Sequence, residues 1–190
     1  PYAGGCKLGK RTVAPHLYAL EEFGVQVVTK NNYYQATIKK RAAREVTLYE
    51  MGDTVSENVL MAAALTEGST TIRNISSNYM VQDMCFFLEV CGVKIEGIGT
   101  NTLIVHGVKD IDKDITYAPS EDPIEAFSFL AAAITTNSHL TIRRCPIDFL
   151  RVELLRLERM GCKFRISKPY VAENKRTLLV DITNLEAGVE

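Results

Sequence analysis

The sequence predicts an α/β (α+β) fold assembled from repeated βαβαββ subdomains. Three segments share a Leu-Glu pair, two variable residues, a glycine and then an alternating apolar run: Leu20–Val27, Leu88–Ile95 and Leu157–Phe164. Each is typical of a helix end, a glycine in the left-handed C-cap, and a following strand. The three glycines recur about 69 residues apart, which indicates an internal repeat.

A second pair of segments supports the same period. Met61–Ser69 and Leu130–Ser138 are Ala-rich helices that end near Gly or Asn, and the β-branched strands Thr70–Arg73 and Leu140–Arg143 follow them. The period is too long for common solenoids, so each copy is expected to pack its helices on a small sheet. A complete copy runs strand, helix, strand, helix, strand, strand. The first copy is cut short and keeps only its second helix and last strands.

The N-terminal elements follow from local signals. Pro15 is tolerated in the first turn of a helix, and Leu17, Leu20 and Phe23 form an apolar stripe along it. Paired asparagines tolerate left-handed backbone in a turn. The expected elements are a helix over Pro15–Phe23, strands Val25–Thr29 and Tyr33–Lys39 around the turn Lys30-Asn31-Asn32, and a strand at Val46–Tyr49.

The middle of the chain predicts the complete copy. Gly52–Glu57 contains Asp, Thr and Ser, which are good N-cap residues for the helix that follows. The expected elements are helices over Asn58–Thr66 and Asp83–Cys91, and strands at Val93–Glu96 and Thr102–His106.

The last third predicts another copy after a polar linker, Lys109–Ala118. Ser120–Pro123 supplies an N-cap and a first-turn proline for a helix. The expected elements are helices over Ile124–Thr135 and Asp148–Met160, and strands at Lys163–Ile166 and Thr177–Ile182.

Composition excludes several classes of protein. Twenty-two Lys and Arg against 23 Asp and Glu give a net charge of −1, so we expect no nucleic-acid partner. No apolar run approaches the ~18 residues of a membrane span, so no membrane partner is expected. Five cysteines without CxxC spacing favour reduced thiols in a cytoplasmic protein and no metal site. The chain opens at Pro1 without a methionine or a signal pattern and is interpreted as a fragment of a longer protein.

The segment Gly4–His16 carries the strongest chemical signal. Three glycines bracket Cys6, and Lys7, Lys10 and Arg11 lie close to it in sequence. Positive neighbours lower a thiol pKa, glycines permit a mobile loop, and an arginine can grip a phosphate with two hydrogen bonds. The residues alone also allow a second interpretation, in which the segment is an exposed basic loop and the cysteine has no function. This alternative stays open because no histidine or carboxylate that could act as a base lies next to the thiol in sequence.

This loop resembles a known family. Gly-Gly-Cys-x-x-Gly-x-Arg, then His-Leu and a helix that ends before glycine, is similar to the catalytic loop of the UDP-N-acetylglucosamine enolpyruvyl transferases, the 1-carboxyvinyltransferases of bacterial peptidoglycan synthesis in the EPSP synthase-like superfamily. The resemblance continues through Glu57–Ala63, Leu65–Thr70, Gly92–Thr100 and Asp122–Ala126, and so spans nearly the whole chain.

The resemblance implies an inside-out α/β barrel with three βαβαββ subdomains in each of two domains, here incomplete. Residues 1–108 would be the C-terminal part of the first domain, with a partial subdomain at 1–40 and a whole one at 41–108. Residues 109–190 would be the first subdomain of the second domain. The remainder of the enzyme would then be a partner of these residues.

The resemblance also implies a reaction. An acid protonates the methylene carbon of phosphoenolpyruvate, a hydroxyl of UDP-N-acetylglucosamine adds to the adjacent carbon, and phosphate leaves, with no cofactor. Cys6 aligns with the catalytic cysteine and Arg11 with an arginine on the phosphate. The residues implied to bind substrate are Arg11, Thr12, Val13, Ala14, Pro15, His16, Glu50, Met51, Gly52 and Asp53.

The sequence departs from the family at three of these positions. Glu50 stands where the family usually has Lys, Asp53 adds a second carboxylate near the diphosphate, and Ala14 replaces an Asp. A carboxylate near a phosphate repels it. Alternatives are therefore a divergent paralogue with another acceptor, a non-catalytic domain of the same fold, or a relative with other chemistry such as the RNA 3′-phosphate cyclases. Alone, the chain is expected to turn over no substrate.

Overall fold

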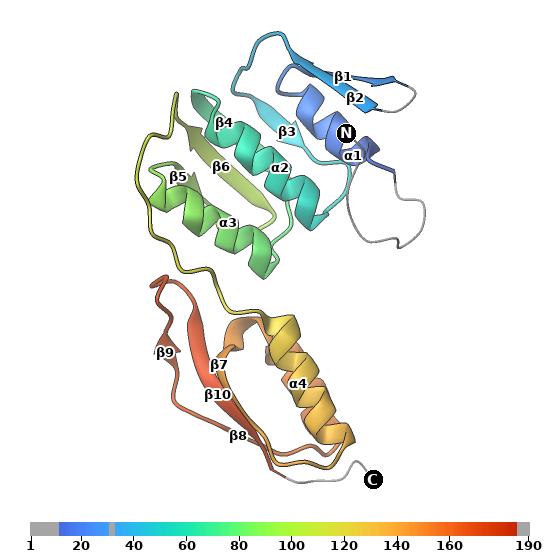
Figure 1. Cartoon of the computed structure of the whole chain (residues 1–190), viewed down its shortest axis with the longest axis vertical. Helices are drawn as coiled ribbons and strands as arrows, with labels where there is room; N and C mark the ends of the chain where they lie inside the picture. Colours follow the sequence, from blue (N-terminus) through green and yellow to red (C-terminus); the bar gives the residue numbers. More distant parts are fainter. Residues whose placement is uncertain (1–11, 31–32, 186–190) are drawn as a thin grey trace. The chain divides into compact units, whose positions relative to one another are not determined.

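The computed structural model describes residues 12–30 and 33–185, and these form two units, one up to Thr116 and one from Tyr117 onward (Figure 1). The division falls inside the predicted linker Lys109–Ala118. Within the described residues this stretch has no helix or strand.

The first unit contains the complete βαβαββ copy that the repeat predicts. Its elements are β3 (Glu45–Thr47), α2 (Asp53–Ala64), β4 (Gly68–Arg73), α3 (Tyr79–Val90), β5 (Lys94–Glu96) and β6 (Thr102–Gly107). The sheet order is β3-β4-β6-β5, with β3 and β4 parallel and the other neighbours antiparallel. This order confirms the predicted fold class.

The core of the first unit forms where the helices meet the sheet. Val59 and Leu60 of α2, Ile72 of β4 and Val105 of β6 are inaccessible to solvent. Apolar residues on α2 recur at helical spacing, whereas those on β4 and β6 alternate, so both periodicities direct side chains into one cluster. The two helices pack against each other, and α2 also contacts β6 (Figure 1).

The truncated first copy packs onto this core. It contributes α1 (Ala14–Glu21) and the antiparallel strands β1 (Val25–Lys30) and β2 (Tyr33–Ile38), as predicted. Ala19 and Phe23 are buried in the same cluster as α2, and α1 contacts both α2 and β1 (Figure 1). The first turns of α1 and α2 are therefore held in one body.

The second unit has α4 (Pro123–Thr135), β7 (Thr141–Pro146), a 3-10 turn (Ile147–Phe149), α5 (Arg151–Arg159), β8 (Phe164–Ile166), β9 (Tyr170–Val171) and β10 (Leu178–Asn184). The sheet order is β7-β10-β8, and β9 also pairs with β10. Asp122 caps α4 as predicted, accepting hydrogen bonds from the backbone N–H groups of Ile124 and Glu125.

The prediction of a complete copy in the second unit is wrong for the described residues. No strand equivalent to β3 precedes α4. The preceding segment contains Asp110, Asp112, Lys113 and Asp114, so it lacks the apolar alternation that would hold a strand against a core. As a result β7 stands at the edge of its sheet, where β4 of the first unit is an inner strand.

Three helix starts also differ from the predictions. Helix α2 begins at Asp53 rather than Asn58, and α3 begins at Tyr79 rather than Asp83. The residue before α2 is Gly52, which makes no side-chain cap, whereas the Asn78 side chain accepts a hydrogen bond from the backbone N–H of Tyr79. Helix α5 begins at Arg151, three residues late, because the chain first makes a 3-10 turn.

Candidate functional site

The predicted site residues fall on two segments of the first unit. Thr12–His16 form the entry and first turn of α1, and Glu50–Asp53 connect β3 to the first turn of α2. Cys6 and Arg11 lie outside the described residues, so their proposed roles rest on the sequence.

The entry to α1 is fixed by local chemistry. The Thr12 hydroxyl oxygen accepts a hydrogen bond of 3.1 Å from the backbone N–H of Ala14. Pro15 occupies the first turn, where a backbone N–H would have no partner within the helix, so proline is tolerated there. Its side chain is buried. His16 is half-buried in the same turn.

Two side-chain contacts join the segments. The amide Nδ2 of Asn58 on α2 donates to Nδ1 of His16 at 2.8 Å. The rings of Tyr18 on α1 and Tyr49, just before Glu50, meet edge to face with centroids 6.2 Å apart and planes at 69°. The structure therefore brings together the α1 entry and the β3–α2 loop, which the resemblance implies to bind the same substrate.

Asp53 stabilises the fold at the start of α2 through hydrogen bonds of its carboxylate. Its Oδ1 accepts a hydrogen bond of 2.6 Å from the Ser76 hydroxyl, and its Oδ2 accepts one of 2.8 Å from Asn78 Nδ2. Ser56 joins the same network, because its hydroxyl accepts from the Ser76 N–H and donates to the Gly52 carbonyl. The carboxylate thus links the start of α2 to the start of α3. These contacts explain why a carboxylate stands at this position.

The remaining carboxylates at this end of α2 differ in environment. Burial raises the pKa of the Glu57 carboxyl above its ordinary value, and the charge of Asp53 adds to the increase. Glu50 and Met51 are exposed. The start of α2 therefore carries the carboxylates of Glu50, Asp53 and Glu57 at the helix end whose dipole would otherwise favour a bound anion.

Sequence reasoning missed Asn58, Tyr18 and Tyr49 as parts of this site. Asn58 belongs to the Glu-Asn pair used for the resemblance, but its partner lies 42 residues away. Tyr49 was expected as the last residue of a strand, yet β3 ends at Thr47. No local pattern shows that two tyrosines on different elements will touch.

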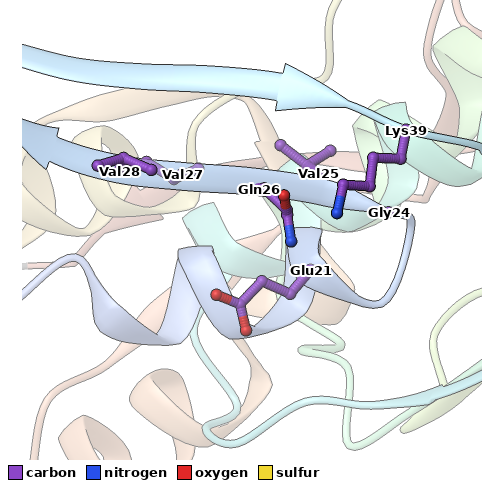
Figure 2. Close-up of a pocket in the computed structure, with 7 residues that line it drawn as sticks. All are labelled: Glu21, Gly24, Val25, Gln26, Val27, Val28 and Lys39. Carbon is purple, nitrogen blue, oxygen red and sulfur yellow. The ribbon is translucent and has the colours of Figure 1, made fainter.

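Two hollows lined by described residues do not coincide with these segments. One, of about 520 Å³, is shown in Figure 2, where Glu21 comes from α1 and Gln26 from β1; its lining is Glu21, Gly24, Val25, Gln26, Val27, Val28 and Lys39. The other, of about 310 Å³, lies in the second unit beside the Glu121–Arg144 ion pair; its lining is Glu121, Asp122, Glu125, Ala126, Phe129, Ile142, Arg143 and Arg144.

The thiols of the described residues are buried and unpaired: Cys85, Cys91, Cys145 and Cys162. Burial raises the pKa of the Cys85 thiol to about 12 and that of the Cys145 thiol to about 11. Such thiols form little thiolate near neutral pH, and thiolate is the reactive form. They agree with the interpretation of these cysteines as small core residues.

Over residues 12–30 and 33–185 we find no cluster of three or more His, Cys, Asp or Glu side chains that could hold a metal ion. Over the same ranges no helix has the length and apolar character needed to cross a membrane.

Comparisons with known proteins identify relatives of this chain. The UDP-N-acetylglucosamine 1-carboxyvinyltransferase of Ruthia magnifica is 35% identical over 182 residues, which cover 94% of this chain and 43% of that protein. The enzyme of the same name from Bradyrhizobium diazoefficiens is 39% identical over 166 residues, 87% of this chain and 38% of that protein. The chain thus spans less than half the length of these relatives.

Solved structures share the fold. The enolpyruvyl transferase NikO from Streptomyces tendae superimposes with a TM-score of 0.69 and 23% identity, over 89% of this chain and 41% of that chain. EPSP synthase from Acinetobacter baumannii gives a TM-score of 0.70 and 19% identity, over 97% of this chain and 42% of that one. The sequence also matches one family over residues 2–186. The chain therefore belongs to the EPSP synthase (3-phosphoshikimate 1-carboxyvinyltransferase) family.

Proposed function

We propose that this chain forms part of an active site that transfers the enolpyruvyl group of phosphoenolpyruvate to UDP-N-acetylglucosamine in peptidoglycan precursor synthesis. The observation that carries the proposal is the identity of 35–39% with 1-carboxyvinyltransferases of that acceptor over most of the chain. The contacts of His16 with Asn58 and of Tyr18 with Tyr49 support it, because they join the two segments assigned to one substrate.

In this proposal each segment has one task. Cys6 is the acid that delivers a proton to the methylene carbon of phosphoenolpyruvate, and its thiolate can also bond to the adjacent carbon. Arg11 holds the phosphate and stabilises the negative charge that it carries away as it leaves. Thr12–His16 and Glu50–Asp53 hold the acceptor, whose hydroxyl adds to the carbon from which phosphate departs.

The domain assignment belongs to the same proposal. Residues 1–108 would complete the first domain of a whole enzyme, and residues 109–190 would begin the second. The rest of that enzyme would be the partner of these residues and would supply the base for the acceptor hydroxyl. The unpaired thiols of the described residues are the basis for proposing a cytoplasmic setting.

A second candidate is enolpyruvyl transfer to an acceptor without a diphosphate. Glu50, Asp53 and Glu57 place three carboxylates along the loop and first turns of α2. The pKa of the Glu57 carboxyl is raised mainly by burial and further by the charge of Asp53, so these two carboxylates are close enough to interact. Ala14 also removes a polar side chain from the α1 entry. Direct comparison of acceptors in the whole enzyme distinguishes the two candidates.

Alkylation by fosfomycin, an epoxide analogue of phosphoenolpyruvate, tests the proposal on this chain. The Cys6 thiolate would attack an epoxide carbon, the C–O bond would open, and the resulting alkoxide would take a proton. We expect one adduct by intact mass, located at Cys6 by peptide mapping and absent in Cys6→Ser. The buried cysteines are internal controls. No adduct, or labelling spread over several cysteines, would reject a phosphoenolpyruvate site on this chain.

A further inference from the structure

Tyr18 and Tyr49 form an exposed aromatic pair at the candidate site. Tyr49 is 79% exposed, more than any other large apolar or aromatic side chain among the described residues, and Tyr18 is 54% exposed. Their rings nevertheless touch, at 6.2 Å between centroids. Burial of an aromatic ring is favourable, so a contacting pair that stays in solvent has unused capacity to bind a ligand.

Each tyrosine of the pair adjoins one of the two proposed acceptor-binding segments, Thr12–His16 and Glu50–Asp53. Tyr18 is two residues beyond His16 on α1, and Tyr49 directly precedes Glu50. The edge-to-face geometry, with planes at 69°, occupies the edge of one ring and one face of the other, so the opposite face of each ring is not used by its partner. Within residues 12–30 and 33–185, neither phenol hydroxyl has a hydrogen-bond partner.

We propose that Tyr18 and Tyr49 form a stacking surface for the planar base of a nucleoside diphosphate acceptor and so help to determine acceptor specificity. The inference rests on the proposed function, because it takes the acceptor to be a uridine diphosphate sugar. Aromatic side chains bind bases through their π faces, and this binding is not weakened by neighbouring carboxylates as phosphate binding is.

The chemistry of the surroundings favours a base over the other parts of such an acceptor. Glu50 follows Tyr49 directly, so a phosphate at the rings would be repelled. The side chain of Ala14 at the α1 entry has no polar group that could hydrogen-bond a base. A base bound there would therefore be held largely by apolar surface, which the two tyrosine rings supply. A flat, neutral heteroaromatic ring fits both conditions.

Binding measurements on this chain test the inference. UDP-N-acetylglucosamine, uridine and N-acetylglucosamine 1-phosphate are titrated by NMR against wild type, Tyr18→Ala, Tyr49→Ala and Tyr49→Phe. Tyr33→Ala is the matched control, since Tyr33 is 48% exposed but lies on β2. We expect both alanine variants at the site to weaken the two uridine ligands about 10- to 100-fold, with Tyr49→Phe and Tyr33→Ala near wild type. The ligand without a base should be unaffected.

The outcomes separate this inference from the proposed function. Equal binding of uridine ligands by wild type and both alanine variants would overturn the stacking surface and leave the function intact. If no uridine ligand binds wild type while fosfomycin alkylates Cys6, the stacking surface is likewise rejected and another acceptor is favoured. Absence of both binding and alkylation would reject the inference and the function together. Backbone amide NMR spectra of Tyr18→Ala and Tyr49→Ala that match wild type away from the substituted residue confirm that these substitutions leave the fold in place.

Discussion

Asn58 and His16, 42 residues apart, are joined by a hydrogen bond of 2.8 Å that ties α2 to the first turns of α1. Because the amide Nδ2 can only donate, His16 Nδ1 is the acceptor, and the neutral ring carries its proton on Nε2. The helix that follows the Gly4–Arg11 segment is thus attached to the helix that begins at the second candidate segment.

Substitution of Asn58 should loosen this attachment. We expect Asn58→Ala to lower the free energy of unfolding of the first unit by about 1 kcal/mol, the usual contribution of one such hydrogen bond. A double-mutant cycle with His16→Ala, followed by urea denaturation, measures the coupling, and ¹⁵N NMR of His16 reports the protonated nitrogen. Strictly additive effects, or a proton on Nδ1 in wild type, would contradict the assignment.

Asp53 should matter more for stability than its neighbour Glu50. Asp53→Ala leaves the Ser76 hydroxyl and the Asn78 amide without their acceptor, so we expect a loss of about 2 kcal/mol in the free energy of unfolding. Glu50 is exposed, and Glu50→Ala should change stability by no more than about 0.5 kcal/mol. Urea denaturation of both variants is the measurement. Similar small effects would show that Asp53 is not part of the scaffold.

The repeat glycines and Asp53 show which parts of the fold could be predicted from local sequence and which could not. The repeat was readable because Gly24, Gly92 and Gly161 obey a local rule, and all three have positive φ as the C-cap prediction requires. The start of α2 was misplaced because Asp53 finds its partners 23 and 25 residues further on, at the entry to α3. Local capping rules contain no information about such contacts.

The same distinction applies to the site. The resemblance selected the segments Thr12–His16 and Glu50–Asp53, and the structure places them on adjacent elements of one unit. It did not identify Asn58, Tyr18 or Tyr49, whose roles come from contacts across the fold. The repeat predicts a complete copy in the second unit, but the charged linker before α4 lacks the apolar alternation of a strand, and no strand is described there.

The glycines of the repeat offer a matched comparison. Gly24 has φ of 80° and Gly161 has φ of 91°, so alanine at either should cost about 1–2 kcal/mol of backbone strain. A Cβ at Gly24 would in addition collide with the backbone carbonyl oxygen of Lys40, whereas one at Gly161 would meet open space. We therefore expect Gly24→Ala to destabilise its unit clearly more than Gly161→Ala destabilises the other. Thermal unfolding, followed by amide probes in each unit, measures both. Equal losses would show that the hairpin shifts to accept the methyl group.

Cys85 should make the first unit sensitive to alkali. Its pKa is raised from 9.0 to about 12 by burial, with a smaller contribution from Glu89. Between these values the unfolded chain loses the thiol proton and the folded chain keeps it, so stability is fully present below pH 9 and falls as pH rises toward 12. Cys85→Ala removes this titration but leaves a small cavity, which lowers stability at every pH. We expect the difference in free energy of unfolding between wild type and Cys85→Ala to be constant from pH 7 to 8.5 and to shrink above pH 9, as measured by urea denaturation. A difference that stays constant up to pH 11 would mean that the folded thiol ionises as readily as the unfolded one.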